Sequence, residues 1–255
     1  MRTRLLFSAF LVVSLLSSAS GASEPIREYG YQIVDQRPHD TDLFTQGLIL
    51  TEEQFYESGG RYGQSRLVRY RAKETRANLE KKLDDRLFAE GLTLLDGTLY
   101  LLTWKAQQLL VLDAESLQLK RTLAYAGEGW GLTHNGEQLI RSDGSSRLHF
   151  HNTEDFGLER SLTVTESGKP IKRLNELEYI QGYIWANIWH SDKLVKINPQ
   201  SGQVLAQLDL RGLAARHRPS GVLNGIAYDQ ARNGLWVTGK NWPILYLLKL
   251  EPELQ

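Results

Sequence analysis

A three-residue phrase recurs five times along this sequence and limits what the chain can fold into. Glycine holds the second position in four copies and glutamate in one, and Leu or Ile holds the third. The second positions are 44, 40, 45 and 49 residues apart. A period of about 40–50 residues with β-type content is typical of propeller blades. The copies are Gln46-Gly47-Leu48, Glu90-Gly91-Leu92, Trp130-Gly131-Leu132, Asn175-Glu176-Leu177 and Asn224-Gly225-Ile226.

Each repeat divides into four short strand candidates separated by turn residues. The second repeat is the clearest, because Asp96-Gly97 between two apolar runs is a strong hairpin signal. Its candidates are residues 88–95, 98–104, 108–113 and 117–124. We therefore predict an all-β chain folded as a five-bladed β-propeller. A β-sandwich with uneven loops is the alternative, and the regular period disfavours it.

The fifth repeat is incomplete, with three strand candidates before the sequence ends. A fourth candidate, Tyr31–Val34, precedes the first repeat. Pairing this N-terminal strand with Ile244–Leu250 would complete the last blade, close the ring and remove its open edges. We predict this closure.

The first 22 residues have the pattern of a secretory signal peptide. Basic residues precede a mostly apolar run over 5–16, which is too short to span a membrane, and Ser20 and Ala22 form a cleavage-like pair. We expect export, to a bacterial periplasm or the exterior. Residues 23–255 are then expected to form a single catalytic propeller domain.

Composition excludes several classes of function. The sequence has no Cys, and its one Met is Met1, so disulfides, thiol catalysis and sulfur ligands to metals are excluded. The 30 basic and 30 acidic residues balance, and beyond the leader, which contains Arg2 and Arg4, acidic residues exceed basic ones by 2. We therefore expect no nucleic-acid partner and no membrane partner, and a monomer.

Two sets of side chains are expected at one mouth of the propeller. An antiparallel hairpin puts the start of its first strand beside the end of its second. The first residues of the five phrases should therefore meet the ends of the second strands. Together these positions hold Gln46, Glu90, Asn175, Asn224, Lys240, Trp104, Trp130 and Trp189.

Glu90 stands out because it is the one carboxylate that leads a phrase. A solvated strand end or a structural ion pair would also explain it. Among indoles, however, a carboxylate loses hydration, which raises its pKa toward a value useful for proton transfer. Lys240 could offset its charge or polarise a carbonyl, and the indoles could box a small group while aiming N–H donors inward.

The sequence resembles the plant- and bacterial-type glutaminyl cyclases, or glutamine cyclotransferases. The resemblance covers essentially all of residues 40–250. The matching stretches are Phe44–Leu48, Phe88–Leu92, Leu102–Lys105, Gly127–Leu132, Leu174–Tyr179, Trp185–Trp189, Leu223–Ala227 and Val237–Lys240. It implies a five-bladed propeller that converts N-terminal glutamine, on peptides or free, to pyroglutamate with loss of ammonia.

The resemblance also implies roles for individual residues. Glu90 is similar to the family's proton-shuttling acid, with Lys240 and Asn175 as further catalytic contacts. The implied substrate-binding residues are Gln46, Phe44, Phe88, Trp104, Trp130 and Trp189. No cofactor or metal is implied for the chemistry, and the implied partners are peptides or proteins that begin with Gln.

Two other classes stay open at this point. A propeller glycosidase needs two carboxyl groups facing one site, and Asp143 or Glu178 are the possible partners of Glu90. A non-catalytic periplasmic binding propeller would also use a Trp-lined mouth.

Overall fold

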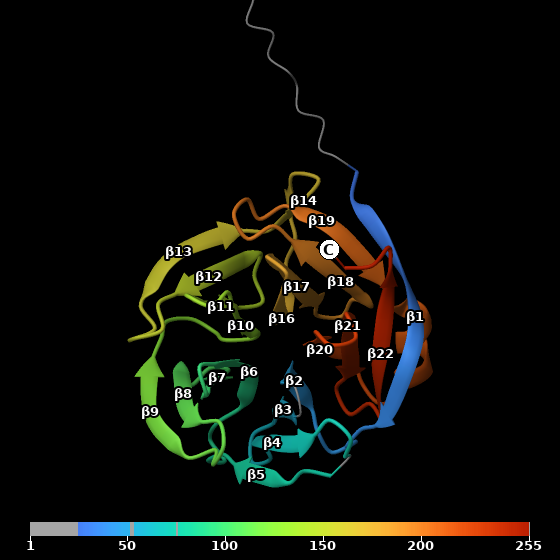
Figure 1. Cartoon of the computed structure of the whole chain (residues 1–255). Helices are drawn as coiled ribbons and strands as arrows, with labels where there is room; N and C mark the ends of the chain where they lie inside the picture. The colour runs from blue at the N-terminus through green and yellow to red at the C-terminus, as the bar shows by residue number, and fades with distance from the viewer. Residues whose placement is uncertain (1–24, 52–53, 75, 255) are drawn as a thin grey trace, which may run out of the picture.

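The computed structural model describes residues 25–51, 54–74 and 76–254. Within these ranges the chain is all-β, apart from helix α1 (Arg211–Ala214) and a 3-10 turn (Ala215–His217). Figure 1 shows the sheets arranged around a common centre. The predicted signal peptide, residues 1–22, lies outside the described residues.

The described part of the chain contains no helix that is long and apolar enough to cross a membrane.

Three sheets each consist of four antiparallel strands in chain order. The first holds β2 (Thr45–Leu50), β3 (Gln54–Gly59), β4 (Arg66–Arg71) and β5 (Leu79–Lys82). The second holds β6 (Ala89–Leu95), β7 (Thr98–Thr103), β8 (Gln108–Asp113) and β9 (Leu119–Ala124). The third holds β10 (Leu132–His134), β11 (Leu139–Ser142), β12 (Arg147–His151) and β13 (Leu158–Thr163). A short hairpin, β14 (Thr165–Glu166) and β15 (Lys169–Pro170), follows.

The remaining strands form one eight-stranded sheet in which β1 (Arg27–Pro38) joins two groups. One group is β16 (Leu174–Ile180), β17 (Tyr183–Ile188), β18 (Lys193–Ile197) and β19 (Val204–Asp209). The other is β20 (Leu223–Asp229), β21 (Gly234–Gly239) and β22 (Ile244–Glu251).

The predicted pairing of the N-terminal strand with the last strand is confirmed. Strand β1 runs antiparallel to β22, with Tyr31 opposite Leu250 and Ile33 opposite Leu248. The sequence did not predict a second pairing, in which the first residues of β1 run parallel to β19. At 12 residues, β1 is long enough to leave one strand group and continue along the next.

The first strands of the five repeats contact one another in sequence around the centre. The contacting pairs are β2 with β6, β6 with β10, β10 with β16, β16 with β20, and β20 with β2. The glycines of the phrases permit this approach. A Cβ added at Gly91 would lie 2.4 Å from the Leu132 nitrogen, and one at Gly131 would lie 2.0 Å from the Asn175 carbonyl oxygen. The repeated glycine is therefore a packing requirement.

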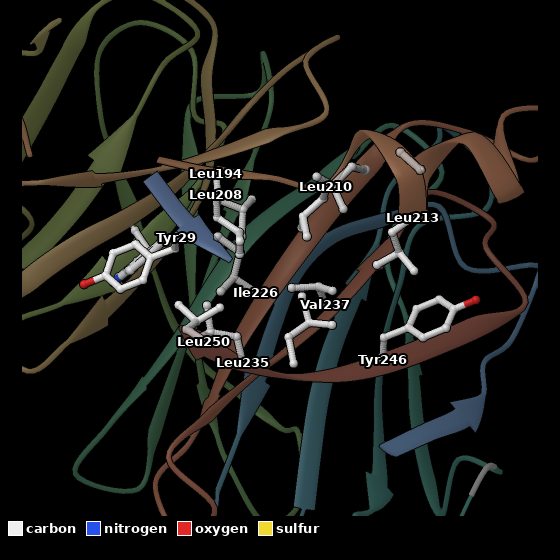
Figure 2. Close-up of a cluster of buried hydrophobic side chains, with 14 of the residues drawn as sticks. Tyr29, Leu194, Leu208, Leu210, Leu213, Ile226, Leu235, Val237, Tyr246 and Leu250 are labelled. Atoms are coloured by element: carbon white, nitrogen blue, oxygen red, sulfur yellow. The ribbon is translucent and has the colours of Figure 1, made fainter. Parts of the chain in front are cut away.

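Five hydrophobic clusters lie between neighbouring strand groups. Figure 2 shows one of them, in which Tyr29 of β1, Leu208 of β19 and Leu250 of β22 pack together. Another joins β3 to β21 through an edge-to-face contact of Phe55 with Trp236, whose ring centroids are 5.7 Å apart. The strands that close the ring, β1 and β22, therefore contribute to a buried apolar cluster, as the other strand groups do.

We expect loss of β1 to destabilise the whole fold. A chain that begins at His39 loses the strand that pairs with β22 and exposes the cluster around Tyr29. Its melting temperature should fall by about 10 °C or more relative to a chain that begins at Ser23 and keeps β1. Calorimetry of the two proteins checks this, and equal melting temperatures would contradict it.

Candidate active site

Four of the five phrases lie in a β-bulge at the start of an inner strand. In the second sheet the register steps from Ala89 opposite Thr103 to Leu92 opposite Leu101, which leaves Glu90 and Gly91 in the bulge. The phrases that begin with Gln46, Asn175 and Asn224 show the same shift. A bulge re-aims side chains. The register also confirms that first-strand starts lie beside second-strand ends, as Thr45 lies opposite Gly59 and Leu223 opposite Gly239.

Glu90 and Lys240 are both buried, each with 5% of its surface exposed. Burial raises the pKa of Glu90 well above its usual range, and the charge of Lys240 opposes this rise. Burial likewise lowers the pKa of Lys240 to about 8, against the attraction of Glu90. Burial therefore favours the neutral form of both groups, and the attraction between them opposes this effect. No described residue donates a hydrogen bond to the Glu90 carboxyl group.

An aromatic wall runs from Lys240 along the mouth. The Lys240 ammonium lies 4.6 Å from the centre of the Phe44 ring. Phe44 meets Phe88 edge-to-face at 6.4 Å, and Phe88 meets Trp104 at 5.5 Å. Tyr62, which is about half exposed, caps this wall at 5.4 Å from Phe88. The structure thus brings together the residues predicted from three different repeats.

Glu128 holds two of the predicted indoles. One of its carboxylate oxygens accepts hydrogen bonds from the Trp104 Nε1–H at 2.7 Å and from the Trp130 Nε1–H at 3.0 Å. The N–H donors of Trp104 and Trp130 are therefore both taken up by Glu128. It also supplies a negative charge that raises the pKa of Glu90.

The third indole completes the wall. Trp189 meets Trp130 edge-to-face, with ring centroids 5.4 Å apart. Behind Trp130 lies Gly144, whose φ is +77° and where an added Cβ would lie 2.5 Å from the indole. The position of Trp130 is therefore set by Glu128, by Trp189 and by the lack of a side chain at residue 144.

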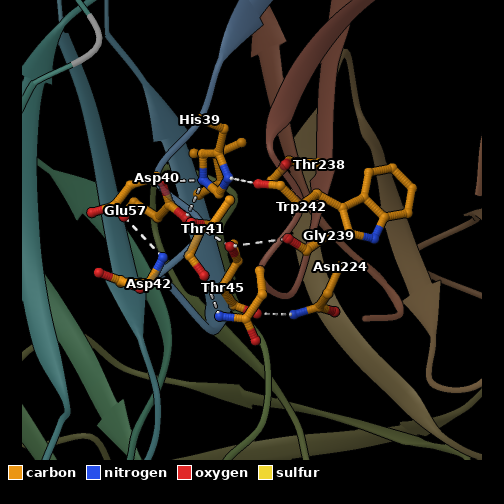
Figure 3. Close-up of polar contacts among 12 residues, drawn as sticks. His39, Asp40, Thr41, Asp42, Thr45, Glu57, Asn224, Thr238, Gly239 and Trp242 are labelled. Carbon is orange, nitrogen blue, oxygen red and sulfur yellow. Dashed lines mark hydrogen bonds and ion pairs between the residues drawn. The ribbon is translucent and has the colours of Figure 1, made fainter. Parts of the chain in front are cut away.

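Thr45, the residue before Gln46, connects the mouth to a buried ion pair. Its hydroxyl donates to Glu57 at 2.7 Å, and its carbonyl accepts from Asn224 Nδ2 at 2.9 Å (Figure 3). Glu57 also accepts from Tyr70 and lies 2.9 Å from His39 Nε2. Burial would lower the pKa of His39, but the charge and hydrogen bond of Glu57 outweigh it and raise this pKa.

Asn175 and Gln46 are buried at the starts of their strands. Asn175 donates from Nδ2 to Asn224 Oδ1 at 2.9 Å. The side-chain oxygens Asn175 Oδ1 and Gln46 Oε1 are buried and have no hydrogen-bond partner among the described residues. Two buried acceptor oxygens are therefore left unpaired among the described residues.

Comparison with known proteins decides the family. The family model of glutamine cyclotransferase matches residues 6–250. The chain belongs to the glutamine cyclotransferase family. It is 35% identical over 254 residues to a glutaminyl-peptide cyclotransferase of Arabidopsis thaliana, covering 96% of this chain and 79% of that protein. It is similar to the crystal structure of Myxococcus xanthus glutaminyl cyclase, with a TM-score of 0.84, 35% identity, and coverage of 89% of this chain and 98% of that one.

Sequence reasoning about this cyclotransferase chain missed Glu128, Tyr62 and the orienting role of Thr45 at the mouth. Glu128 had one visible signal, since it stands between two glycines, Gly127 and Gly129, just before Trp130. In the described ranges no group of three or more His, Cys, Asp or Glu side chains could hold a metal ion.

The charge of Lys240 should lower the pKa of Glu90. In Lys240→Met the carboxylate loses the opposite charge that stabilises it, so the pKa of Glu90 should rise further. Infrared difference spectra over a pH titration check this, with the Glu90 band identified by its loss in Glu90→Gln. Lys105→Met is the control, because this exposed lysine at the same mouth does not act on Glu90. An equal shift in both variants would contradict the pairing.

Gly144→Ala should displace Trp130. We compare it with Gly136→Ala, where φ is +96° and nothing lies within 4 Å of an added Cβ. Both variants should lose about 1–2 kcal/mol of stability, because a left-handed backbone disfavours Ala. Only Gly144→Ala should also change the near-ultraviolet circular dichroism of the Trp130–Trp189 pair. Identical spectra in the two variants would show that the indole does not depend on this glycine.

Proposed function

We propose that this chain is a five-bladed β-propeller enzyme that cyclises N-terminal glutamine to pyroglutamate and releases ammonia. The blades would be the three four-stranded sheets, the group β16–β19, and β20–β22 completed by β1. Supporting this are the five hydrophobic clusters between neighbouring groups and the closed circuit of first strands.

One observation carries the catalytic part of the proposal. Glu90 is a buried carboxyl group that has a cation, Lys240, beside it and no hydrogen bond from a described residue. Burial favours the protonated form of this group, while the charge of Lys240 favours the ionised form, and such a group can take up a proton and return it. An aromatic wall stands next to this pair and can hold a small side chain.

The reaction uses these groups as follows. The substrate's α-amine attacks its own γ-carboxamide carbon, so a C–N bond forms and closes a five-membered ring. Glu90 takes a proton from the attacking amine and gives it to the γ-nitrogen, whose bond to carbon breaks as ammonia leaves. The Lys240 ammonium stabilises the negative charge that develops on the carbonyl oxygen.

Binding supplies the remaining catalysis. Nucleophile and electrophile are tethered in one residue, so the protein's task is to fold the side chain into a near-attack geometry. The aromatic side chains of Phe44, Phe88 and Trp104 and the Trp130–Trp189 pair are suited to this role. Glu128 fixes the indoles in place and contributes no donor to the substrate.

The partners we propose are peptides or proteins that begin with Gln, in line with the activity named for the Arabidopsis relative. We propose that the enzyme is an exported monomer and that its chemistry needs no cofactor. The signal-peptide pattern of residues 1–22 supports export.

The glycosidase alternative finds less support in the surroundings of its candidate carboxylates. Asp143 lies 2.9 Å from His149 Nε2 and accepts from Ser145, and these hydrogen bonds outweigh burial to lower its pKa to about 2. Glu178 accepts from the Tyr228 nitrogen, and burial raises its pKa to about 8. Neither Asp143 nor Glu178 contributes to the shift in the pKa of Glu90.

Glu90→Gln should abolish cyclisation and keep the fold. Glutamine is nearly isosteric but cannot transfer a proton, so turnover should fall by about 10²–10⁴-fold. Ammonia release from a Gln-initiated peptide, corrected for the spontaneous rate, measures it, and aryl glycosides in parallel test the alternative class.

Glu176→Gln and Glu178→Gln are the matched controls. Burial raises the pKa of both carboxyl groups, so an amide imitates their neutral form. Both variants should keep far more activity than Glu90→Gln. Full activity in Glu90→Gln would eliminate the proton-shuttle role.

A further inference from the structure

Two cations contact one aromatic ring at the mouth. The Arg61 guanidinium carbon lies 4.5 Å from the centre of the Phe44 ring, and the Lys240 ammonium lies 4.6 Å from the same centre. Lys240 is buried, whereas Arg61 is exposed. Burial is the main cause of the lowered pKa of Lys240, and the positive charge of Arg61 adds to it. Arg61 therefore stands at the exposed rim of the mouth, within electrostatic reach of the buried site.

The loop that carries Arg61 packs against the aromatic wall. It connects β3 to β4, and its next residue, Tyr62, meets Phe88 at 5.4 Å and Trp104 at 6.5 Å. A Cβ added at Gly60 would lie 2.2 Å from Phe88 Cε1, so the backbone of the loop also lies close to this ring. Consecutive residues of the loop thus line the mouth.

Asn241 fixes the direction of the Arg61 side chain. Asn241 Nδ2 donates to the Thr41 carbonyl at 2.7 Å, and Asn241 Oδ1 accepts from Arg61 Nη2 at 2.9 Å. A backbone carbonyl can only accept, so the Asn241 amide must turn its oxygen toward Arg61. The φ of Arg61 is +134°, a strained value for an L-residue that persists only where the surroundings hold it. The contacts with Asn241 and Phe44 provide such a hold.

The guanidinium keeps donors for a ligand. None of the ion pairs of the described arginines includes Arg61. Arg66, in the strand that follows, does have such a partner, since it pairs with Asp40 at 2.8 Å. A guanidinium presents five N–H donors in a planar fork that matches the two oxygens of a carboxylate. The free part of this fork is therefore suited to an anion.

Charge is distributed unevenly over the mouth. The Glu128 carboxylate lies between Trp104 and Trp130 and has Lys105 at 4.0 Å. Negative charge is thus held at these two indoles, whereas the cations around Phe44 have no such carboxylate between them. A carboxylate on a ligand would be attracted toward the Phe44 ring and repelled by Glu128.

We propose that Arg61 forms a subsite for a carboxylate on the residue that follows the substrate's N-terminal glutamine. This rests on the function proposed above. The glutamine must reach the buried Glu90 and Lys240, so the rest of the peptide leaves past the exposed rim where Arg61 stands. The carboxylate comes from an acidic side chain at the second residue or, in a dipeptide, from its C-terminus. Either presents two acceptor oxygens to the guanidinium.

Binding measured without turnover tests the subsite. In a Glu90→Gln background, calorimetry gives the dissociation constants of two peptide pairs: Gln-Asp amide with Gln-Asn amide, and Gln-Ala with Gln-Ala amide. Within each pair a carboxamide replaces one carboxylate. In at least one pair the charged peptide should bind about three- to tenfold more tightly, and Arg61→Met should remove most of that preference. The pair that responds identifies the source of the carboxylate.

Lys105→Met is the matched control, because it removes one positive charge from the same mouth. Lys105 lies 4.1 Å from the centre of the Trp104 ring and, unlike Arg61, has a carboxylate partner, Glu128. This variant should leave both ratios unchanged. The proposal is overturned if neither pair shows a preference, if Arg61→Met keeps the preference, or if Lys105→Met loses it equally.

Ammonia release from Gln-Ala amide by the unmodified enzyme is measured separately. Its absence would refute the proposed function, whereas the dissociation constants would still decide whether Arg61 binds a carboxylate.

Discussion

Close approach of backbones around the centre is the constraint on which the rest of this structure depends. The first strands of the repeats lie so near one another that a Cβ at Gly91 or Gly131 would collide with the next strand's backbone. A regular strand would alternate its side chains through this region. The bulges interrupt that alternation at four of the phrases and let a residue such as Glu90 leave the crowded centre. Packing at the centre and polar side chains at the mouth thus have one origin.

The sequence predicts the fold well because its signals are local and repeated. Asp96-Gly97 fixes a hairpin by itself, and five copies of one phrase fix the order of the sheets. The pairing of Tyr31–Val34 with the last strand followed from counting strands. The parallel pairing of Arg27 with Ala206 did not, because nothing local distinguishes a strand that ends at one sheet from one that continues along the next.

The sequence predicted which side chains lie together, and it predicted their orientation less well. Residue types at equivalent positions identified Glu90, Lys240 and the indoles. Those positions do not indicate the direction of each hydrogen bond, because that direction depends on partners distant in sequence. Glu128 takes the indole N–H groups, and the Thr45 carbonyl accepts from the Asn224 amide. Such directions follow from donors and acceptors in three dimensions, and a repeat pattern contains none of that information.

The buried glutamates differ in what surrounds their carboxyl groups. Glu57 is held by His39, Thr45 and Tyr70. Burial raises the pKa of Glu176 and Glu178, and no described cation opposes that rise. Glu90 differs from them in three respects taken together. Burial raises its pKa, the charge of Lys240 opposes that rise, and no described residue donates a hydrogen bond to its carboxyl group. A nearby cation counteracts part of the effect of desolvation on a buried carboxyl group. Among the described glutamates whose pKa burial raises, Glu90 is the one whose rise a cation, Lys240, opposes.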